Sequence, residues 1–273
     1  LKGYRDSLDK DSLTEIAYGN WHIGALTAIV FLGFMLRYMP ANGMEYLQAA
    51  DPYYIFRMSQ HYALEGNLPQ LDFMRYFPYA APTYLAYNGD FIIPALLYNS
   101  GFSLVFPSFL EFAQFYPALM GALSVLVMYF LGKEYFGKNA GLASAFFLAV
   151  TSAALRRTSA GFFEKEPIGV FLMLTSLLFF SRAWKKESWP YGIGSGLALG
   201  LFTVSWGGSQ ILWLIYPIIA GGTIFLDLEV RSLIAAITPT VLIAGPFATI
   251  LLPRRFSLTS SLFLLSMAVL GAI

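Results

Sequence analysis

The sequence predicts an all-α membrane protein of about eight transmembrane helices with a long first loop on the outer face. Hydrophobic residues make up 57% of the 273 residues and only 12% are charged, whereas soluble domains are roughly 25% charged. Apolar runs recur at the length of about 17 to 25 residues that a helix needs to cross a bilayer. Residues 1–273 are therefore expected to form a single transmembrane domain, with the lipid bilayer as a partner and no nucleic-acid partner.

The expected spans follow the apolar runs along the chain. They cover residues 21–38, 112–131, 140–155, 168–184, 191–204, 211–226, 233–252 and 258–273. Residues 1–20 are polar and mixed in charge, unlike a cleavable signal peptide, so we expect a cytosolic N-terminus. Alternation of the spans then places residues 39–91, the first outer loop, and residues 155–167, the second, on the outer face.

Basic residues give the orientation little support by number, because lysine and arginine are nearly balanced between the two faces. Their identities differ more, since the expected outer face carries mostly arginine. These arginines are Arg37, Arg57, Arg75, Arg156, Arg157, Arg254 and Arg255. A planar guanidinium group suits bidentate capture of phosphate or carboxylate, although some of these side chains are also placed to snorkel or to pair with acids.

The first outer loop is punctuated by prolines and rich in aromatic residues, which suits the membrane interface. A connection of this length in a compact protein is usually functional. Residues 91–106 are apolar but contain Pro94, Asn99 and Gly101, so we expect them to lie in the interface. If they span instead, the orientation inverts downstream. Because the chain ends inside an apolar stretch at Ile273, a missing C-terminal portion is also expected.

Carboxylates between hydrophobic spans are costly unless they bind something, so Asp51, Glu164 and Glu166 are the first candidates for a site. Asp51 precedes Pro52 and Glu166 precedes Pro167, and both arrangements are typical of helix N-caps. Capping does not explain Glu164. Three acids on one face would instead suit a divalent cation, and hard oxygen ligands favour Mg²⁺ or Mn²⁺. The absence of cysteine excludes a thiolate site.

A third segment, Ser205-Trp206-Gly207-Gly208-Ser209, lies between two expected spans. Its glycines allow close approach of the backbone, and tryptophan is typical of the membrane interface. A tight turn with an aromatic anchor explains the pattern as well as a binding role does.

Taken in order, these motifs resemble the catalytic subunits of oligosaccharyltransferases, most closely the single-subunit archaeal enzymes. The motifs are Asp51-Pro52-Tyr53-Tyr54 followed by Arg57, the Arg157-Thr158-Ser159-Ala160-Gly161 run before Glu164-Lys165-Glu166, and Trp206-Gly207-Gly208. With Gly132-Lys133-Glu134 and Gly141-Leu142-Ala143, the resemblance covers nearly the whole chain. It implies a fold like that of the glycosyltransferase-C membrane enzymes.

The resemblance further implies transfer of a preassembled glycan from a dolichol phosphate or diphosphate carrier to asparagine in Asn-x-Ser/Thr, at the outer face of the cell membrane. Asp51, Glu164 and Glu166 would hold a divalent cation, Mn²⁺ or Mg²⁺, and Asp51 would also contact the acceptor amide. Arg157 would support the acids or the phosphate. The carrier side would be lined by Arg57, Arg157, Trp206 and Gly207.

The chain also departs from the family pattern. The second acidic motif is more often Asp-x-Asp, whereas Glu164 and Glu166 are each one methylene longer. A further outer-loop glutamate and the Trp-Trp-Asp motif of a soluble C-terminal domain are absent from this sequence, which contains no Trp-Trp pair. The chain thus carries the metal half of the implied site without the half that reads the sequon, and inactivity of this chain alone is an open outcome.

Two other functions remain open on the sequence. One is a membrane transferase that uses a polyprenyl-phosphate sugar and another acceptor. The other is a transporter or scaffold subunit without catalysis, in which intramembrane acids couple to ions. Transporters usually place such acids near the bilayer midplane on broken helices, whereas the acids here flank the ends of spans, which favours an enzyme.

Overall fold

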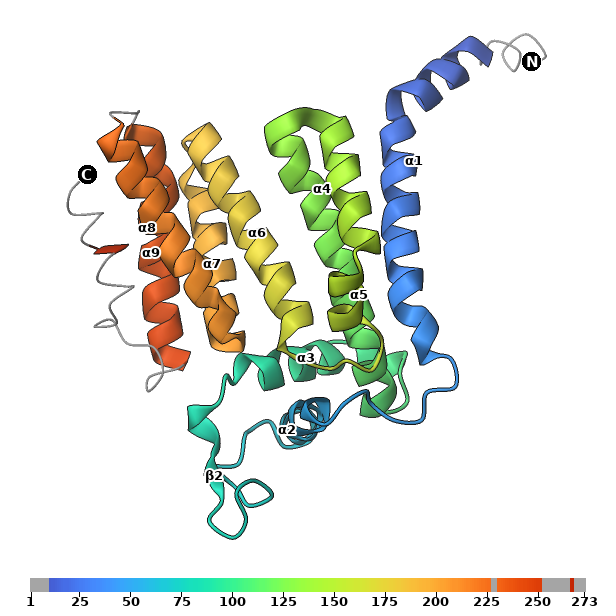
Figure 1. The fold of residues 1–273 in the computed structure, drawn as a ribbon, viewed down its shortest axis with the longest axis vertical. Helices are drawn as coiled ribbons and strands as arrows, with labels where there is room; N and C mark the ends of the chain where they lie inside the picture. Colours follow the sequence, from blue (N-terminus) through green and yellow to red (C-terminus); the bar gives the residue numbers. More distant parts are fainter. Residues whose placement is uncertain (1–9, 227–229, 252–265, 268–273) are drawn as a thin grey trace, which may run out of the picture.

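The computed structural model describes residues 10–226, 230–251 and 266–267 and is a helical bundle closed at one end by short elements (Figure 1). The long helices stand side by side. They are α1 (Lys10–Tyr38), α4 (Phe109–Val150), α6 (Lys165–Lys186), α7 (Trp189–Ser205), α8 (Gln210–Phe225) and α9 (Val230–Leu251). In the described part of the chain, 5 helices are long and apolar enough to cross a membrane. The predicted all-α architecture, with several apolar helices of membrane-spanning length, is confirmed within these residues.

Helix α4 turns back on itself, so its 42 residues form two antiparallel arms (Figure 1). The reversal occurs at Gly137, whose φ of 83° is costly for residues with a side chain. The arms pack closely, because a Cβ at Gly132 would lie 2.8 Å from Ser144 Oγ. Residues 132–139, which separate the expected spans 112–131 and 140–155, therefore contain only a sharp turn between two helical arms. Expected spans 112–131 and 140–155 fall on the two arms, the second continuing into α5 (Ser152–Thr158).

The other expected spans follow the remaining long helices, except for residues 258–273, which lie almost entirely outside the described residues. Residues 91–106 do not form a span. They contain α3 (Gly89–Asn99) and the 3-10 turn η3 (Phe102–Leu104). A helix of 11 residues is about 16 Å long, roughly half of the hydrocarbon thickness. The alternative in which this segment crosses the membrane and inverts the orientation is thus contradicted.

Between α1 and α4 the chain folds into short elements at the lower end of the bundle in Figure 1. They include α2 (Asp51–Glu65) and an antiparallel pair of strands, β1 (Leu71–Asp72) and β2 (Ala81–Pro82), with Leu71 opposite Pro82. The 3-10 turns η1 (Met39–Ala41), η2 (Thr83–Leu85) and η4 (Gly207–Ser209) lie at or next to this end. The predicted first outer loop is thus a folded segment, which gives Asp51 and Asp90 fixed positions.

Small residues allow the helices to pack closely. Gly192, Gly196 and Gly200 recur every four residues on α7, and a Cβ at each would collide with atoms of α9. Such a stripe lets two apolar helices approach closely in a membrane, where lipid exposure supplies no hydrophobic driving force. The α7–α9 pair therefore forms a tight base for the turn that carries Trp206 and Gly207.

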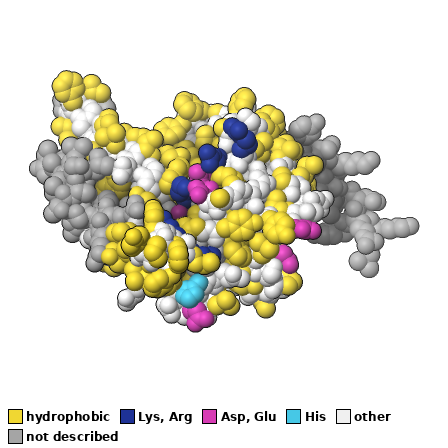
Figure 2. Space-filling model, turned by 60° about the horizontal axis from the view of Figure 1, so that its bottom comes forward, with side chains coloured by type: hydrophobic (Ala, Val, Ile, Leu, Met, Phe, Trp, Pro, Cys, Tyr) yellow, Lys and Arg dark blue, Asp and Glu magenta, His cyan; other side chains and the backbone are white. Residues whose placement is uncertain are grey.

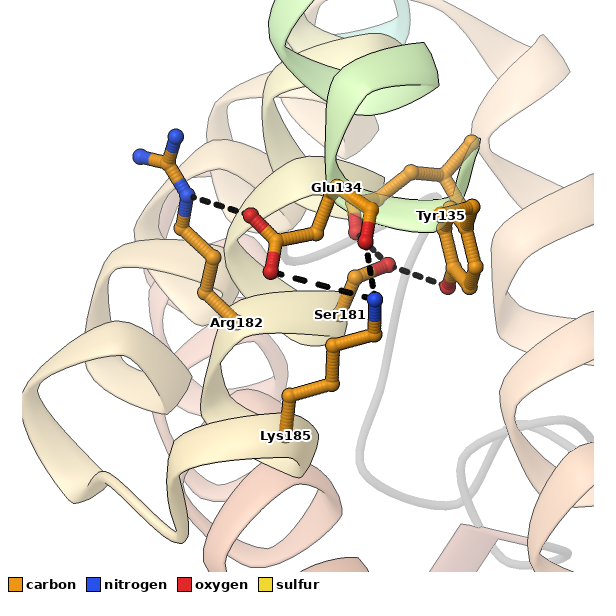
Figure 3. A network of polar contacts seen from close by, with 6 residues as sticks. Glu134, Tyr135, Ser181, Arg182 and Lys185 are labelled. Carbon is orange, nitrogen blue, oxygen red and sulfur yellow. Dashed lines mark hydrogen bonds and ion pairs between the residues drawn. The ribbon is translucent and has the colours of Figure 1, made fainter. Parts of the chain in front are cut away.

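At the end of the bundle opposite α2 and α3, polar contacts join α4 to α6 (Figure 3). Arg182 Nε lies 3.2 Å from Glu134 Oε2, and Lys185 bonds to the main-chain carbonyl of Glu134. Tyr135 OH and Ser181 Oγ are hydrogen-bonded at 2.6 Å. These contacts hold the tip of the α4 hairpin against the end of α6.

Candidate functional site

The alternating direction of the long helices brings the three sequence motifs to the same end of the bundle (Figure 1). Asp51 begins α2, Glu164 directly precedes α6, and Trp206 links α7 to η4. A cavity of about 560 Å³ opens between Asp51, Lys165 and Trp206, and neither Glu164 nor Glu166 is among its lining residues. Its lining includes Asp51, Arg75, Asp90, Lys165, Trp206 and Gly207. Figure 2 shows charged side chains gathered on this end, within a largely hydrophobic surface.

Main-chain hydrogen bonds fix the segment that leads to Glu164. Ala160 N–H donates to Arg37 O at 2.8 Å, and Gly161 N–H donates to Gln114 O at 3.0 Å. The carbonyl of Gly161 in turn accepts a hydrogen bond from Gln48 N–H. Gly161 has a φ of 79°, which glycine adopts readily. The acidic segment is thus tied to the end of α1, to α4 and to the segment before Asp51.

The carboxylates of this segment are partly compensated by neighbouring cations. Glu164 is buried, and its Oε2 lies 3.1 Å from Lys165 Nζ. Burial raises the pKa of Glu164; Lys165 opposes this shift, while Glu166 and Asp51 add to it. Glu166 Oε1 lies 3.5 Å from an Arg157 nitrogen, and its buried Oε2 has no hydrogen-bond partner among the described residues. Asp51, Glu164 and Glu166 therefore share one electrostatic environment.

A fourth acid of the site, Asp90, was not predicted from the sequence. It lies in the first turn of α3, its residue is 6% exposed, and its Oδ1 finds no partner within the described residues. Burial raises the pKa of Asp90 well above its ordinary value; Lys165 opposes this, and Glu166 and Glu164 reinforce it. The available signal was its place directly before the apolar stretch 91–106, the same position that Glu166 takes before its span.

Helix capping does not account for the predicted acids. The N-cap of α2 is Ala50 and not Asp51, which is the first helical residue. Glu164 is the N-cap of α6, but its side chain makes no capping hydrogen bond, and Glu166 lies in the first turn. The capping interpretation of Asp51 and Glu166 is therefore wrong. Both acids still benefit from the positive end of the helix dipole.

The donor chemistry of the site suits a hard divalent cation, and the orphaned Glu166 Oε2 offers such an ion a buried acceptor. The geometry is not yet that of a metal centre. Within the described residues, no three carboxylate or imidazole groups converge closely enough to hold an ion. Asp51, Glu164 and Glu166 as metal ligands thus stay a prediction, and side-chain movement would be needed to bring them together.

The residues expected to bind the lipid carrier lie partly in this cavity and partly in two neighbouring clefts. Trp206 and Gly207 line the cavity itself, and Trp206 packs on Gly169 of α6, where a Cβ would lie 2.5 Å from the indole ring. Arg57 lies 2.5 Å from Asp72 and lines a neighbouring cleft with Asp51. A separate cleft is lined by Arg156, Arg157, Ser159 and Phe162.

Arg75, which was one of several outer-face arginines in the sequence, also belongs to the cavity. Its guanidinium donates a hydrogen bond of 3.0 Å to Tyr54 OH and lies 4.3 Å from the centre of the Tyr54 ring. The cavity therefore combines carboxylates with two cationic groups, Arg75 and Lys165, beside the aromatic wall of Trp206. Such a lining can bind an anionic headgroup and a polar acceptor side by side.

The bundle and this polar cavity define a polytopic helical membrane protein whose site lies at one end of its helices. The family model "Oligosaccharyl transferase STT3, N-terminal" matches residues 23–271. The chain therefore belongs to the STT3 family of oligosaccharyl transferases, as the resemblance of its motifs predicted.

Known relatives are named for glycan transfer. The chain is 26% identical over 261 residues to dolichyl-phosphooligosaccharide-protein glycotransferase 3 of Archaeoglobus fulgidus, covering 84% of this chain and 29% of that protein. It is 29% identical over 192 residues to glycotransferase 1 of Pyrococcus furiosus, covering 67% of this chain and 19% of that protein.

Solved structures share the fold. The apo oligosaccharyltransferase of A. fulgidus superposes with a TM-score of 0.74 at 19% identity, over 92% of this chain and 33% of that one. The A. fulgidus enzyme AglB in complex with an inhibitory peptide and a dolichol-phosphate gives a TM-score of 0.72 at 20% identity, over 94% and 33%. The chain spans about a third or less of the length of these proteins.

Proposed function

We propose that this chain is the membrane part of an archaeal oligosaccharyltransferase, which transfers a glycan from a dolichol phosphate or diphosphate carrier to the asparagine of Asn-x-Ser/Thr. The observation that carries the proposal is the cavity in which the three family motifs meet, lined by Asp51, Lys165, Trp206 and Gly207. Membership of the STT3 family and the names of the relatives support it.

In the proposed reaction the bond between the anomeric carbon of the glycan and the carrier phosphate oxygen breaks, and the oxygen keeps the electron pair. A bond forms between the anomeric carbon and the asparagine amide nitrogen, which loses a proton to water or to a carboxylate of the site. Asp51 would orient the acceptor amide. Arg157, with Arg57, Trp206 and Gly207, would bind the carrier phosphate and its lipid.

A divalent cation, Mn²⁺ or Mg²⁺, held by Asp51, Glu164 and Glu166 is part of the proposal. When bound, such an ion supplies positive charge that stabilises the leaving phosphate. The chain's own residues would then keep the carboxylates ionised and hold the carrier phosphate and the acceptor asparagine in a fixed relative orientation.

We further propose eight spans, a cytosolic N-terminus and a site on the outer face of the cell membrane. The far end of the bundle, at the tip of α4 and the end of α6, carries Lys133, Lys138, Lys185 and Lys186. Lysines near span ends are typical of the cytoplasmic side. The site end carries mostly arginines, with Lys165 beside them, and a guanidinium group is suited to phosphate.

The test is glycopeptide formation by the full-length protein that carries this chain, in lipid nanodiscs, given a dolichol-phosphate-linked glycan, Mn²⁺ and a fluorescent Asn-x-Thr peptide. Glu164→Gln and Glu166→Gln should each abolish transfer, since each removes a charged ligand. Glu45→Gln, at an exposed acid outside the cavity lining, is the matched control and should keep activity. Transfer to a serine-rich peptide but not to Asn-x-Thr would favour the alternative transferase. Undiminished transfer by both site variants would refute the proposed roles.

A further inference from the structure

Lys165 is the cation most closely surrounded by the acids of the site. Its Nζ lies 3.1 Å from Glu164 Oε2, and the side chain of Glu164 is only 5% exposed. Glu166 and Asp90 also interact electrostatically with this ammonium group. The ammonium group of Lys165 therefore interacts electrostatically with three acids, Glu164 and Glu166 beside it in the sequence and Asp90 in α3.

This ion pair conflicts with binding of a divalent cation at Glu164. An ammonium group and a metal ion seek the same carboxylate lone pairs, so each excludes the other from Glu164 Oε2. The structure shows Glu164 engaged by Lys165, and within the described residues no three acids converge on one point. A metal ion must displace the ammonium group before it can use this ligand.

Asp90 offers the displaced ammonium group a second position. Asp90 is 6% exposed, and its Oδ1 has no partner in the part of the chain that the structure describes. A buried carboxylate without a partner is costly, and an approaching cation removes that cost. Asp90 and Lys165 line the same cavity, and the flexible four-carbon stem of a lysine lets its ammonium group move by several ångströms.

We propose that Lys165 is a resident counter-ion of the acidic site, which passes from Glu164 to Asp90 when a divalent cation binds Glu164. The inference rests on the proposed function only in taking Glu164 as a metal ligand. It gives Lys165 and Asp90 roles as positioning residues. Lys165 sets the affinity for the ion by competing with it, and Asp90 lowers the cost of its displacement.

The test measures Mn²⁺ binding to the purified chain in nanodiscs by the electron paramagnetic resonance signal of free Mn²⁺. Lys165→Gln removes the competitor and should lower the Kd on the order of tenfold. Lys165→Arg keeps a cation and should change the Kd much less. The control is Lys186→Gln at the other end of α6, about 31 Å away along the helix, which should bind Mn²⁺ like the unaltered protein.

A double-mutant cycle separates the role of Asp90 from simple attraction of its charge for Mn²⁺. Asp90→Asn should raise the Kd several-fold in the presence of Lys165 but have little effect beside Lys165→Gln, where no ammonium group needs a second position. Equal weakening in both backgrounds would refute the exchange. Circular dichroism of each variant verifies that the helices are retained, and the Lys165 variants test the competition even where Asp90→Asn does not fold.

An unchanged or higher Kd for Lys165→Gln would overturn the inference, as would the lack of Mn²⁺ binding by both this variant and the unaltered chain. The glycopeptide assay distinguishes this failure from failure of the proposed function. Transfer without any effect of Lys165→Gln on Mn²⁺ binding would refute the counter-ion alone. Tighter Mn²⁺ binding by the variant, in a full-length protein that transfers no glycan, would refute only the proposed function.

Discussion

Arg37 Nε, at the end of α1, donates a hydrogen bond of 2.7 Å to Thr158 Oγ1 in α5. The guanidinium group also donates to the carbonyls of Leu148 and Ala149 at 3.0 and 2.9 Å. These carbonyls belong to the last turn of α4, which has too few main-chain partners of its own. A single arginine, 1% exposed, thus joins α1, α4 and α5 directly behind the acidic segment.

Replacement of Arg37 by methionine should therefore destabilise the protein by roughly 2–4 kcal/mol, because several buried acceptors lose a charged donor. Thr158→Val removes only the bond to Nε and the hydroxyl's own bond to Ala154, and should cost about 1 kcal/mol. The shift of the thermal unfolding midpoint in nanodiscs measures both changes. Equal midpoints for the two variants would contradict the role of the bonds between Arg37 and α4.

Gly121 on α4 makes room for the same arginine. A Cβ at this position would lie 2.5 Å from Arg37 Cδ and Nε. Gly121→Ala should push the guanidinium out of its hydrogen bonds and lower stability by about 1–3 kcal/mol. Gly24→Ala is the matched control, since a Cβ at Gly24 would meet nothing within 4 Å and alanine favours helix. Unfolding midpoints should fall for Gly121→Ala and stay or rise for Gly24→Ala; the reverse order would refute the packing argument.

The pair of Arg57 and Asp72 should make the β1–β2 segment sensitive to pH. Burial alone would raise the pKa of Asp72, but hydrogen bonds from Arg57 and from Met74 N–H lower it overall. An acid with a lowered pKa stabilises the fold above its unfolded pKa, and this contribution is lost as the pH falls through the folded pKa.

Amide hydrogen exchange across residues 71–82, corrected for intrinsic rates, should thus accelerate as the pH falls below about 4. Asp72→Asn should weaken protection of this segment at neutral pH by about 1 kcal/mol and remove its dependence on acid pH, because the pair is partly exposed. A variant with the same pH dependence as the unaltered protein would show that Asp72 is not responsible.

The wall formed by Trp206 depends on Gly169. Gly169→Ala places a methyl group against the indole ring and should displace Trp206 into the cavity. If Trp206 lines the carrier site, the affinity for dolichol phosphate in detergent should fall by about tenfold, a loss of about 1.4 kcal/mol. Gly222→Ala on α8, where a Cβ meets nothing within 4 Å, is the control. Unchanged affinity in Gly169→Ala would separate Trp206 from carrier binding.

The helices were predictable from the sequence because their apolar runs are long, and a bilayer permits few alternatives to helix. The position of Asp51, Glu164 and Glu166 at the ends of these runs predicted that they share one end of the bundle. Residues 91–106 were expected not to span, and their helix is too short to do so. The sharp reversal at Gly137, which replaces an expected loop, was not accessible from the sequence.

The roles of individual charged residues were harder to predict, because they depend on tertiary contacts. Arg37 was grouped with arginines suited to phosphate, yet it binds main-chain carbonyls and Thr158. Arg57 is likewise engaged by Asp72. Asp90 was overlooked because a lone acid in an expected loop carries no motif. Its burial depends on tertiary packing, in which Gly89 lies close to Ser205.

The main-chain hydrogen bonds from Ala160 to Arg37 and from Gly161 to Gln114 join segments that are synthesised at different times. During synthesis, Asp51 emerges long before its glutamate neighbours, and nothing anchors the later segment until α1 and α4 have been inserted and packed. A nascent protein arrested before Glu164 would carry Asp51 and Asp90 but neither glutamate of the acidic segment. The acidic site is therefore expected to form late in biogenesis, after α1 and α4 have been inserted and packed.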